Sequence, residues 1–188
     1  SEDFYFLEKL SKITSINKIS SAKVFPSSRR SWRVPFGTGQ RINRFFAGTH
    51  NEDSLYDPKS FEVLKLWLEK FFSDEILSAE EYVSLAKEID SSLTDFLLNQ
   101  SFPEAWTKIV NETTKVDQLQ KQKYFWFDGF RTLKLIHYLR DTSYPMVSMF
   151  DALDQLFANY NVKVWQSESV ALWQNQFEYL KVLRNLAT

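Results

Sequence analysis

Glycine is scarce in this chain, and its distribution constrains the fold more than any other feature of the sequence. Only 4 of the 188 residues are glycine, whereas glycine is usually about 7% of a chain. Tight β-hairpins need glycine at positions of positive φ, so this scarcity argues against an all-β fold. Three of the four, Gly37, Gly39 and Gly48, lie in or beside one arginine-rich stretch. We therefore expect helices with one irregular interruption.

Apolar residues recur at helical spacing in the first 16 residues and again after residue 56. Residues 3–16 place Phe6, Leu10 and Ile13 on one face and predict a first helix (1–16 with its flanks). Similar stripes predict helices at 57–73, 78–98, from 103, 115–140, 145–158 and from 167 onward. Their short connections favour antiparallel neighbours. The expected fold is an all-α, six to seven helix bundle in a single domain spanning 1–188, with the regular part at 57–188.

Two of the predicted helices begin with specific capping signals. Asp57 is followed by Pro58, which is an N-cap residue before proline at the first helical position. Ser78 and Glu81 have the spacing of a capping box. These signals predict where the helices at 57–73 and 78–98 begin.

The helix predicted at 115–140 carries an unusual number of aromatic rings. Its apolar stripe is formed by Leu119, Trp126, Phe130, Leu133 and His137. Four consecutive rings, Tyr124 to Phe127, cover the full circumference of a helix, so one neighbour cannot bury them all. We expect this helix to be central in the fold or to expose one face as an interface with another chain.

A basic arm, residues 17–56, interrupts the helical pattern. The window from Lys9 to Asn51 contains nine Lys or Arg and no Asp or Glu. Since the whole chain has 23 basic and 24 acidic residues, the remainder has 14 basic and 24 acidic residues and a net charge of −10. Pro26, Pro35 and the Gly37–Gly39 turn predict a long, mostly irregular segment, with one short helix at 40–47.

The centre of the basic arm combines arginines with aromatic rings. Arginine side chains neutralise phosphates and release counterions, and aromatic faces stack on unpaired bases. Trp32 is the exception among tryptophans, which otherwise fall mostly on apolar stripes and are expected in the core. The candidate residues for binding nucleic acid or a partner are Arg29, Arg30, Trp32, Arg33, Phe36, Arg41 and Arg44.

The basic arm has a second interpretation. The arginines can be neutralised by the carboxylates of the same chain, because the remainder is as acidic as the window is basic. They can equally pair with an acidic protein partner. If the arm is neutralised internally, the chain is a protein–protein adaptor rather than a nucleic-acid-binding protein.

Several chemical classes lack support in the sequence. The Gly37-Thr-Gly39 segment has neither the spacing nor the lysine of a phosphate-binding P-loop. The chain has no cysteine, which excludes disulfides and thiolate nucleophiles and fits an intracellular protein. No apolar run approaches the length of about 18 residues needed for a membrane span.

A metal or other cofactor is also not expected. The only two histidines, His50 and His137, stand in different contexts. Glu81, Glu88 and Asp95 recur every seven residues, and we interpret them as a solvated acidic face of one helix.

Arg131 and His137 form an R-x5-H pattern within RTLKLIH. This resembles the R-x4-6-H pattern of the HEPN ribonucleases, which are all-α. The resemblance implies metal-independent RNA cleavage at a dimer interface, with Arg131 and His137 as the reacting pair. Six positions along a continuous helix rotate by about 600°, which leaves the two side chains about 120° apart, so convergence requires a broken helix.

Taken together, these features predict a non-catalytic helical binding subunit. The basic arm is expected to contact nucleic-acid phosphates or an acidic partner, and the helical body is expected to dock in a larger assembly with other proteins. The protein–protein adaptor and the HEPN-like ribonuclease are the alternatives.

Overall fold

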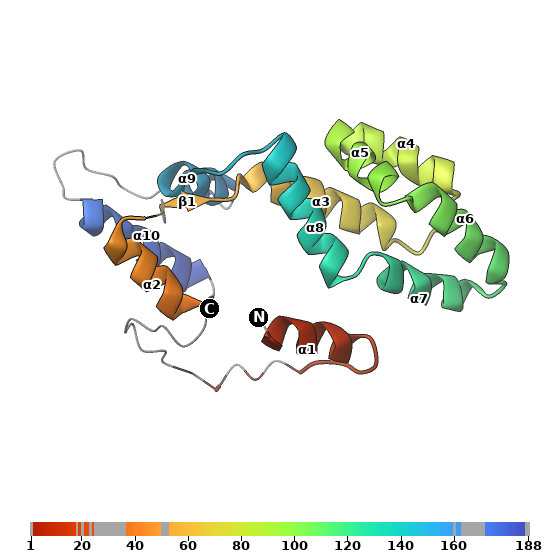
Figure 1. Ribbon diagram of the computed structural model, residues 1–188, viewed down its shortest axis with the longest axis horizontal. Coiled ribbons are helices and arrows are strands. Elements are labelled where there is room, and N and C mark those ends of the chain that lie inside the picture. Colours follow the sequence, from red (N-terminus) through yellow and green to blue (C-terminus); the bar gives the residue numbers. More distant parts are fainter. Residues whose placement is uncertain are drawn as a thin grey trace.

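A computed structural model describes residues 2–17, 37–49, 53–159, 161–162 and 172–186, together with positions 19, 21, 22 and 24. These residues form ten helices and one short strand pair, which confirms the all-α class (Figure 1). The helices are α1 Glu2–Ser11, α2 Thr38–Ala47, α3 Pro58–Phe71, α4 Ala79–Ile89, α5 Ser91–Asn99, α6 Phe102–Glu112, α7 Val116–Trp126, α8 Gly129–Thr142, α9 Met149–Asn159 and α10 Leu172–Leu186. The strands are β1 Ser54–Leu55 and β2 Val147–Ser148.

Both predicted caps are present. The Asp57 carboxylate accepts a hydrogen bond from the Lys59 N–H at 2.9 Å at the start of α3. At the start of α4, the Ser78 hydroxyl accepts from the Glu81 N–H at 3.2 Å, and the Glu81 carboxylate accepts from the Ser78 N–H at 2.7 Å. These contacts confirm the capping box and the beginnings of both helices.

Two helices expected to be continuous are each divided by an aspartate. The helix predicted at 78–98 forms α4 and α5, and the Asp90 carboxylate between them accepts from the Ser92 N–H at 2.7 Å. The helix predicted at 115–140 forms α7 and α8, and Asp128 accepts from the N–H groups of Phe130 and Arg131, each at 3.1 Å. Such an aspartate offers its own side chain to the following turn, and this competes with continuation of the helix.

The main hydrophobic core is formed by residues of the six helices from α3 to α8 and is built largely of aromatic rings. Trp67, Phe71 and Tyr82 are fully buried and pack against Phe102 and Trp106. The centroids of neighbouring rings are 4.9 to 6.2 Å apart, and most pairs adopt the edge-to-face arrangement that such rings prefer. Burial of these tryptophans confirms the expectation that they form the core.

The apolar stripe predicted across residues 115–140 is correct only in its first half. Leu119 and Trp126 on α7 are buried. Leu133, expected on the same stripe, is 43% exposed, and α8 instead buries Leu135 and Leu139. The break at Asp128 changes the direction of the chain, so the helical phase of α7 does not continue into α8.

A loop between α3 and α4 is held by side chains from three different helices. Lys123 on α7 is fully buried, and its ammonium donates to the carbonyls of Ser73 at 2.8 Å and Glu75 at 2.6 Å. Tyr82 donates to the Glu75 carbonyl at 3.1 Å, and the Trp106 indole donates to the carbonyl of Leu77 at 2.9 Å. These bonds fix the turn that joins the first two helices of the core.

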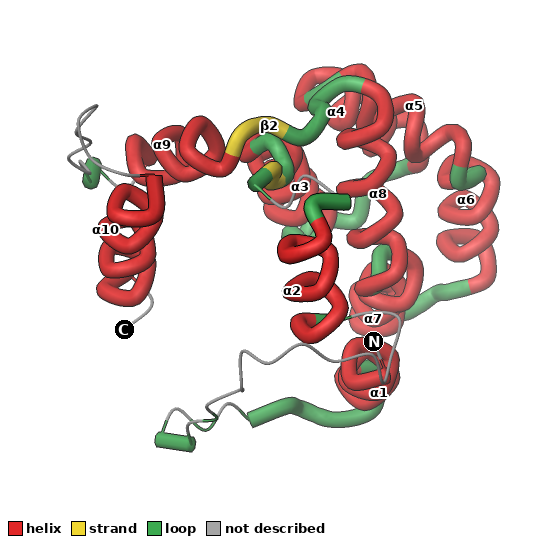
Figure 2. Tube along the Cα trace, turned by 60° about the vertical axis from the view of Figure 1, so that its left-hand side comes forward, coloured by secondary structure: helices red, strands yellow, loops and turns green. Residues whose placement is uncertain are grey.

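A second, smaller hydrophobic cluster lies away from the main core. Leu153 and Phe157 on α9 pack against Tyr179 on α10. Figures 1 and 2 show these two helices at the opposite side of the molecule from α4–α6. The Tyr179 hydroxyl donates to the carboxylate of Asp154, which joins the two helices. The predicted start of the last helix at residue 167 lies outside the described residues.

The strand pair connects the entry to α3 with the entry to α9. β1 and β2 are antiparallel, with Ser54 opposite Ser148 and Leu55 opposite Val147. The Met149 N–H extends this pairing by donating to the Asp53 carbonyl at 2.7 Å. The sequence does not predict the pair, because two residues on each side are too few to show an alternating pattern.

We expect Asp90→Ala to destabilise the fold. Asp90 caps α5 and also accepts a hydrogen bond from the Tyr144 hydroxyl at 2.5 Å, which raises the pKa of Tyr144 to about 12. Loss of an N-cap costs about 0.5–2 kcal/mol, and loss of the tyrosine contact about 0.5–1.5 kcal/mol more. Urea unfolding measures the change in the free energy of unfolding.

Asp95→Ala is the matched control for this experiment. Asp95 is an exposed carboxylate in the middle of α5 that makes no capping contact. Exposed substitutions of this kind change stability by less than about 0.5 kcal/mol. Equal effects of the two substitutions would contradict the capping role of Asp90.

Candidate functional site

The structure describes part of the predicted basic-aromatic site. Arg41 and Arg44 lie on α2. The other predicted binding residues lie outside the described residues, and they are Arg29, Arg30, Trp32, Arg33 and Phe36. The site can therefore be built from α2 alone, and the contribution of residues 29–36 stays a prediction.

The helix α2 is well delimited within the basic arm. It begins at Thr38, two residues before the predicted start, and ends at Ala47 as expected. Gly48 follows in the left-handed conformation with φ 60°, and its N–H donates to the Phe45 carbonyl at 3.2 Å. A glycine accommodates this C-terminal turn without the strain that a Cβ atom would add.

Aromatic rings and arginines lie together on α2. Asn43 is its buried residue, with 4% of its surface exposed. Phe45 and Phe46 are 59% and 61% exposed, and their rings meet edge to face with centroids 5.7 Å apart. Arg41 is exposed and Arg44 is half-buried. The last turns of α2 therefore combine exposed apolar rings with positive charge.

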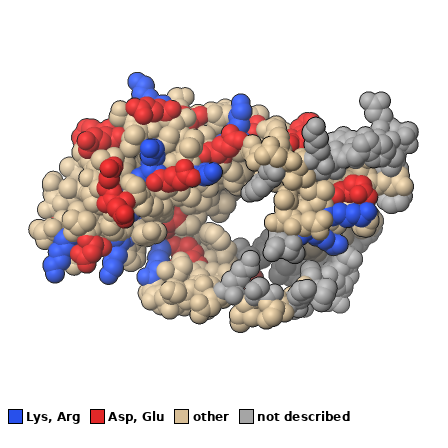
Figure 3. All heavy atoms as spheres, turned by 180° about the vertical axis from the view of Figure 1, so that it is seen from behind, with Lys and Arg blue, Asp and Glu red and all other residues tan. Residues whose placement is uncertain are grey.

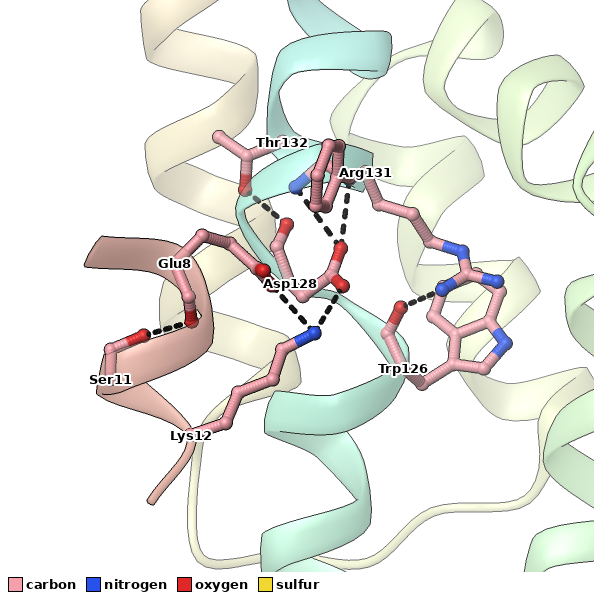
Figure 4. A network of polar contacts seen from close by, with 8 residues as sticks. Glu8, Ser11, Lys12, Trp126, Asp128, Arg131 and Thr132 are labelled. Carbon is pink, nitrogen blue, oxygen red and sulfur yellow. Dashed lines mark hydrogen bonds and ion pairs between the residues drawn. The ribbon is translucent and has the colours of Figure 1, made fainter. Parts of the chain in front are cut away.

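A second feature of interest is the docking of α1 at the break between α7 and α8 (Figure 4). The Lys12 ammonium, just after α1, lies 2.8 Å from the Asp128 carboxylate and 2.5 Å from that of Glu8. The hydrogen bond to Asp128, followed by the one to Glu8, raises the pKa of Lys12. The Glu8 side chain is 5% exposed, so one of these three charges is held almost out of water.

Burial and hydrogen bonding act in opposite directions on the pKa of Asp128. Burial alone pushes the pKa of the Asp128 carboxyl upward, but the hydrogen bonds from Lys12 and from the Arg131 N–H outweigh burial. The pKa of Asp128 therefore lies below its ordinary value. The same carboxylate thus caps α8 and holds α1 against it.

The absence of a side chain at Gly129 allows α1 to pack closely against the start of α8. A Cβ atom added to Gly129 would lie 3.2 Å from Cγ of Glu8 and 3.5 Å from the ring of Phe4. Phe4 and Tyr5 also contact Phe130, with ring centroids 5.8 and 5.2 Å apart. The N-terminal end of α8 is thus the surface on which α1 rests.

A pocket of about 640 Å³ lies between α1 and the helices α3, α7 and α8. Ligand pockets typically occupy about 300–1,000 Å³, with mostly apolar walls and a few polar groups. Here the α3–α7 side carries aromatic rings and one lysine, whereas the α1–α8 side carries two carboxylates and one lysine. Its principal lining residues are Glu8, Lys12, Phe72, Lys121, Tyr124 and Asp128. We call this cavity the α1 pocket.

The aromatic run at 124–127 divides between the core and this pocket. Trp126 and Phe127 are 6% and 3% exposed, whereas Tyr124 and Phe125 are 61% and 49% exposed. Tyr124 stacks on Phe72 with centroids 4.5 Å apart and planes 17° apart. Trp126 and Phe127 therefore belong to the core, and Tyr124, Phe125 and one side of Phe127 line the α1 pocket.

An apolar groove of about 840 Å³ lies between β1, α3 and α9. Phe61 and Leu66 on α3 are 50% and 45% exposed at its wall. The groove is lined further by Leu55, Leu153 and Leu156, with Glu62 and Lys65 among its polar residues. We call it the α3–α9 groove.

The structure does not bring Arg131 and His137 together. The Arg131 guanidinium lies 4.4 Å from the Trp126 ring centroid and donates to the Trp126 carbonyl at 2.5 Å. His137 instead stacks on Tyr56, with ring planes 6° apart. Both residues lie on the uninterrupted helix α8, because the chain breaks before Gly129 rather than between them.

The acidic face proposed for the helix at 78–98 is divided by the break at Asp90. Glu81 and Glu88 lie on α4, whereas Asp95 lies on α5. The Glu81 carboxylate is part of the capping box, and this hydrogen bonding lowers its pKa. Among the described residues, no group of three or more His, Asp or Glu side chains has the geometry of a metal site.

Comparisons with known proteins give no assignment: no family model matches the chain, and neither curated proteins nor solved structures yield a match. No helix in the described part of the chain combines the length and apolar character needed to cross a membrane.

The α1 pocket was not predicted from the sequence. Its walls come from residues 8–12, 68–72 and 121–132, which are far apart along the chain. The Asp128-Gly129 pair was the available signal, because an aspartate before a glycine is typical of a break in a helix.

We expect Asp128→Asn to loosen α1 without unfolding α8. Asparagine is also a good N-cap residue, so α8 keeps its cap, but the charge that holds Lys12 is lost. Hydrogen exchange should show faster exchange of the amides of residues 5–11 and little change within α8. Asp117→Asn is the control, because Asp117 is an exposed acidic residue in the first turn of α7.

The wild-type protein should show the same change at low pH. Because the pKa of Asp128 is lowered in the folded protein, its contact with Lys12 is fully stabilising when the pH is above the ordinary pKa of 3.8. This stabilisation is lost as the pH falls through the lowered pKa. Protection of α1 that stays unchanged in Asp128→Asn would show that the ion pair does not hold this helix.

Proposed function

We propose that this chain is a binding subunit whose basic arm holds the phosphates of a nucleic acid. The observation that carries the proposal is α2, which presents the exposed rings of Phe45 and Phe46 on the same helix as Arg41 and Arg44. Arginines supply the attraction to phosphates, and exposed rings supply stacking on unpaired bases. The arm also includes Arg29, Arg30 and Arg33, which add positive charge on the N-terminal side of α2.

The proposal is supported by the carboxylates of the helical body, from α3 onward, many of which already have partners within the body. Several of its carboxylates accept hydrogen bonds from their own helix starts, as Asp57 and Asp90 do. Asp128 caps α8 in the same way and also pairs with Lys12, one of the nine basic residues of the window. Others form ion pairs within one helix, such as Lys65 with Glu69 and Lys108 with Glu112. Figure 3 shows acidic and basic side chains interspersed over the face of the body. The body thus has a mixed surface, in contrast to the acid-free window.

The α3–α9 groove favours a second candidate function. Exposed Phe61 and Leu66 at an apolar groove suit contact with another protein. The chain would then be a protein–protein adaptor, or would dock in an assembly while the arm holds its ligand. Association with a protein that persists after nuclease treatment and is lost in Phe61→Ala would favour the adaptor.

We expect Arg41→Glu combined with Arg44→Glu to weaken binding of a labelled single strand. Each lost phosphate contact lowers the salt-dependence slope by about 0.7 for a single strand, so the double variant should lower it by about 1.4 or more. Reversal of charge should also reduce the affinity at least tenfold at low salt, since repulsion replaces attraction. Fluorescence anisotropy across a salt series measures both quantities.

Lys87→Glu combined with Lys108→Glu is the matched control. It changes the net charge by the same amount at exposed positions on α4 and α6. Equal losses in the two double variants would mean that the effect is one of net charge only. Absence of binding by the wild type at low salt would refute the nucleic-acid proposal.

The rings of α2 give a separate prediction. Phe45→Ala combined with Phe46→Ala should weaken binding to a single strand by about 1–3 kcal/mol for each stacked base. Binding to a duplex should change much less, because paired bases are not available to stack on these rings. The two affinities, compared in the same buffer, check the prediction. Equal effects on both ligands would rule out stacking at α2.

A further inference from the structure

We propose that the α1 pocket binds one unpaired nucleotide, with its base stacked on Tyr124 and its phosphate beside Lys121. This inference rests on the proposed function, because the nucleotide belongs to the single strand held by the basic arm. The chain connects the two features directly, since α1 and Lys12 lead into the arm. Figures 1 and 2 show α1 beside the region where α7 meets α8.

The aromatic wall suits a nucleobase. Phe72 and Tyr124 already form a stacked pair, with centroids 4.5 Å apart and planes 17° apart. Tyr124 is nevertheless 61% exposed, so Phe72 covers only part of it. A base that enters the pocket extends this stack by one ring. Phe125 adds a second ring to the same pocket at 49% exposure.

Lys121 is positioned for a phosphate. It lies three and four residues before Tyr124 and Phe125, so the three side chains share one face of α7. Lys121 is exposed at the pocket wall, and the structure gives its ammonium no ion pair among the described residues. A base on the rings therefore places its phosphate within reach of an available positive charge.

The opposite wall supplies hydrogen-bond acceptors. Glu8 and Asp128 line the pocket and share a single ammonium, that of Lys12. Carboxylates accept hydrogen bonds from the exocyclic amine of cytosine. The volume of about 640 Å³ is in the range of small-molecule sites. Stacking, phosphate and amine contacts together define the ligand class as a nucleotide with an amine-bearing base.

Isothermal titration of the full chain with cytidine 5′-monophosphate tests the proposal, with ribose 5-phosphate as the probe that lacks a base. We expect cytidine 5′-monophosphate to bind and ribose 5-phosphate to bind at least tenfold more weakly, because the base supplies the stacking contact. Lys121→Ala combined with Tyr124→Ala should weaken binding of cytidine 5′-monophosphate tenfold or more. Circular dichroism verifies that this variant keeps its helices.

Phe61→Ala combined with Lys65→Ala is the matched control. It removes a half-exposed ring and an exposed lysine from the α3–α9 groove, and it should leave binding of cytidine 5′-monophosphate unchanged. Absence of nucleotide binding by the wild type, or binding that survives Lys121→Ala with Tyr124→Ala, would overturn the assignment.

Failure of this inference is distinguishable from failure of the proposed function. If a labelled single strand binds through Arg41 and Arg44 while the pocket variant binds it as tightly as the wild type, the α1 pocket is not a nucleotide site. If no strand binds at low salt, the arm proposal fails instead. Weaker strand binding in both the arm variant and the pocket variant supports the inference.

Discussion

The main core depends on the hydrogen bonds between the buried ammonium of Lys123 and the loop that joins α3 to α4. Lys123 donates to two carbonyls of the α3–α4 loop, at 2.8 and 2.6 Å, while its side chain lies among aromatic rings. Burial lowers the pKa of Lys123, because apolar surroundings disfavour the charged ammonium. A buried charge is tolerated only when hydrogen bonds replace its hydration. Carbonyls just beyond the end of a helix supply these bonds, and the negative end of the helix dipole adds to them.

The packing that follows from this arrangement also creates the α1 pocket. Lys123 and Trp126 hold one face of α7 in the core, so Lys121, Tyr124 and Phe125 are directed toward the other side. Asp128 is the last residue before α8, and its carboxylate forms an ion pair with Lys12. A short helix such as α1 is marginal by itself in water, so its helical state depends on this docking. The same two segments, α7 and the α7–α8 connection, thus contribute both to the packing of the fold and to the α1 pocket.

Local signals predicted much of the fold. The caps at Asp57 and Ser78 act over two or three residues, so they are readable from the sequence and are present in the structure. The breaks at Asp90 and Asp128 were not predicted, because an aspartate within an apolar stripe is compatible with a continuous helix until its carboxylate turns back to cap the next turn. The error at Leu133 follows from the missed break at Asp128.

The sequence by itself determined the all-α class, the tryptophans of the core and the segregation of nine basic residues in an acid-free window. These properties depend on residue type and on spacing within one helix. Only the tertiary structure decided which rings of the 124–127 run are buried and that Lys12 meets Asp128. It also decided that Arg131 and His137 contact different neighbours. Such outcomes depend on contacts between residues up to 116 positions apart, and no local pattern in the chain encodes them.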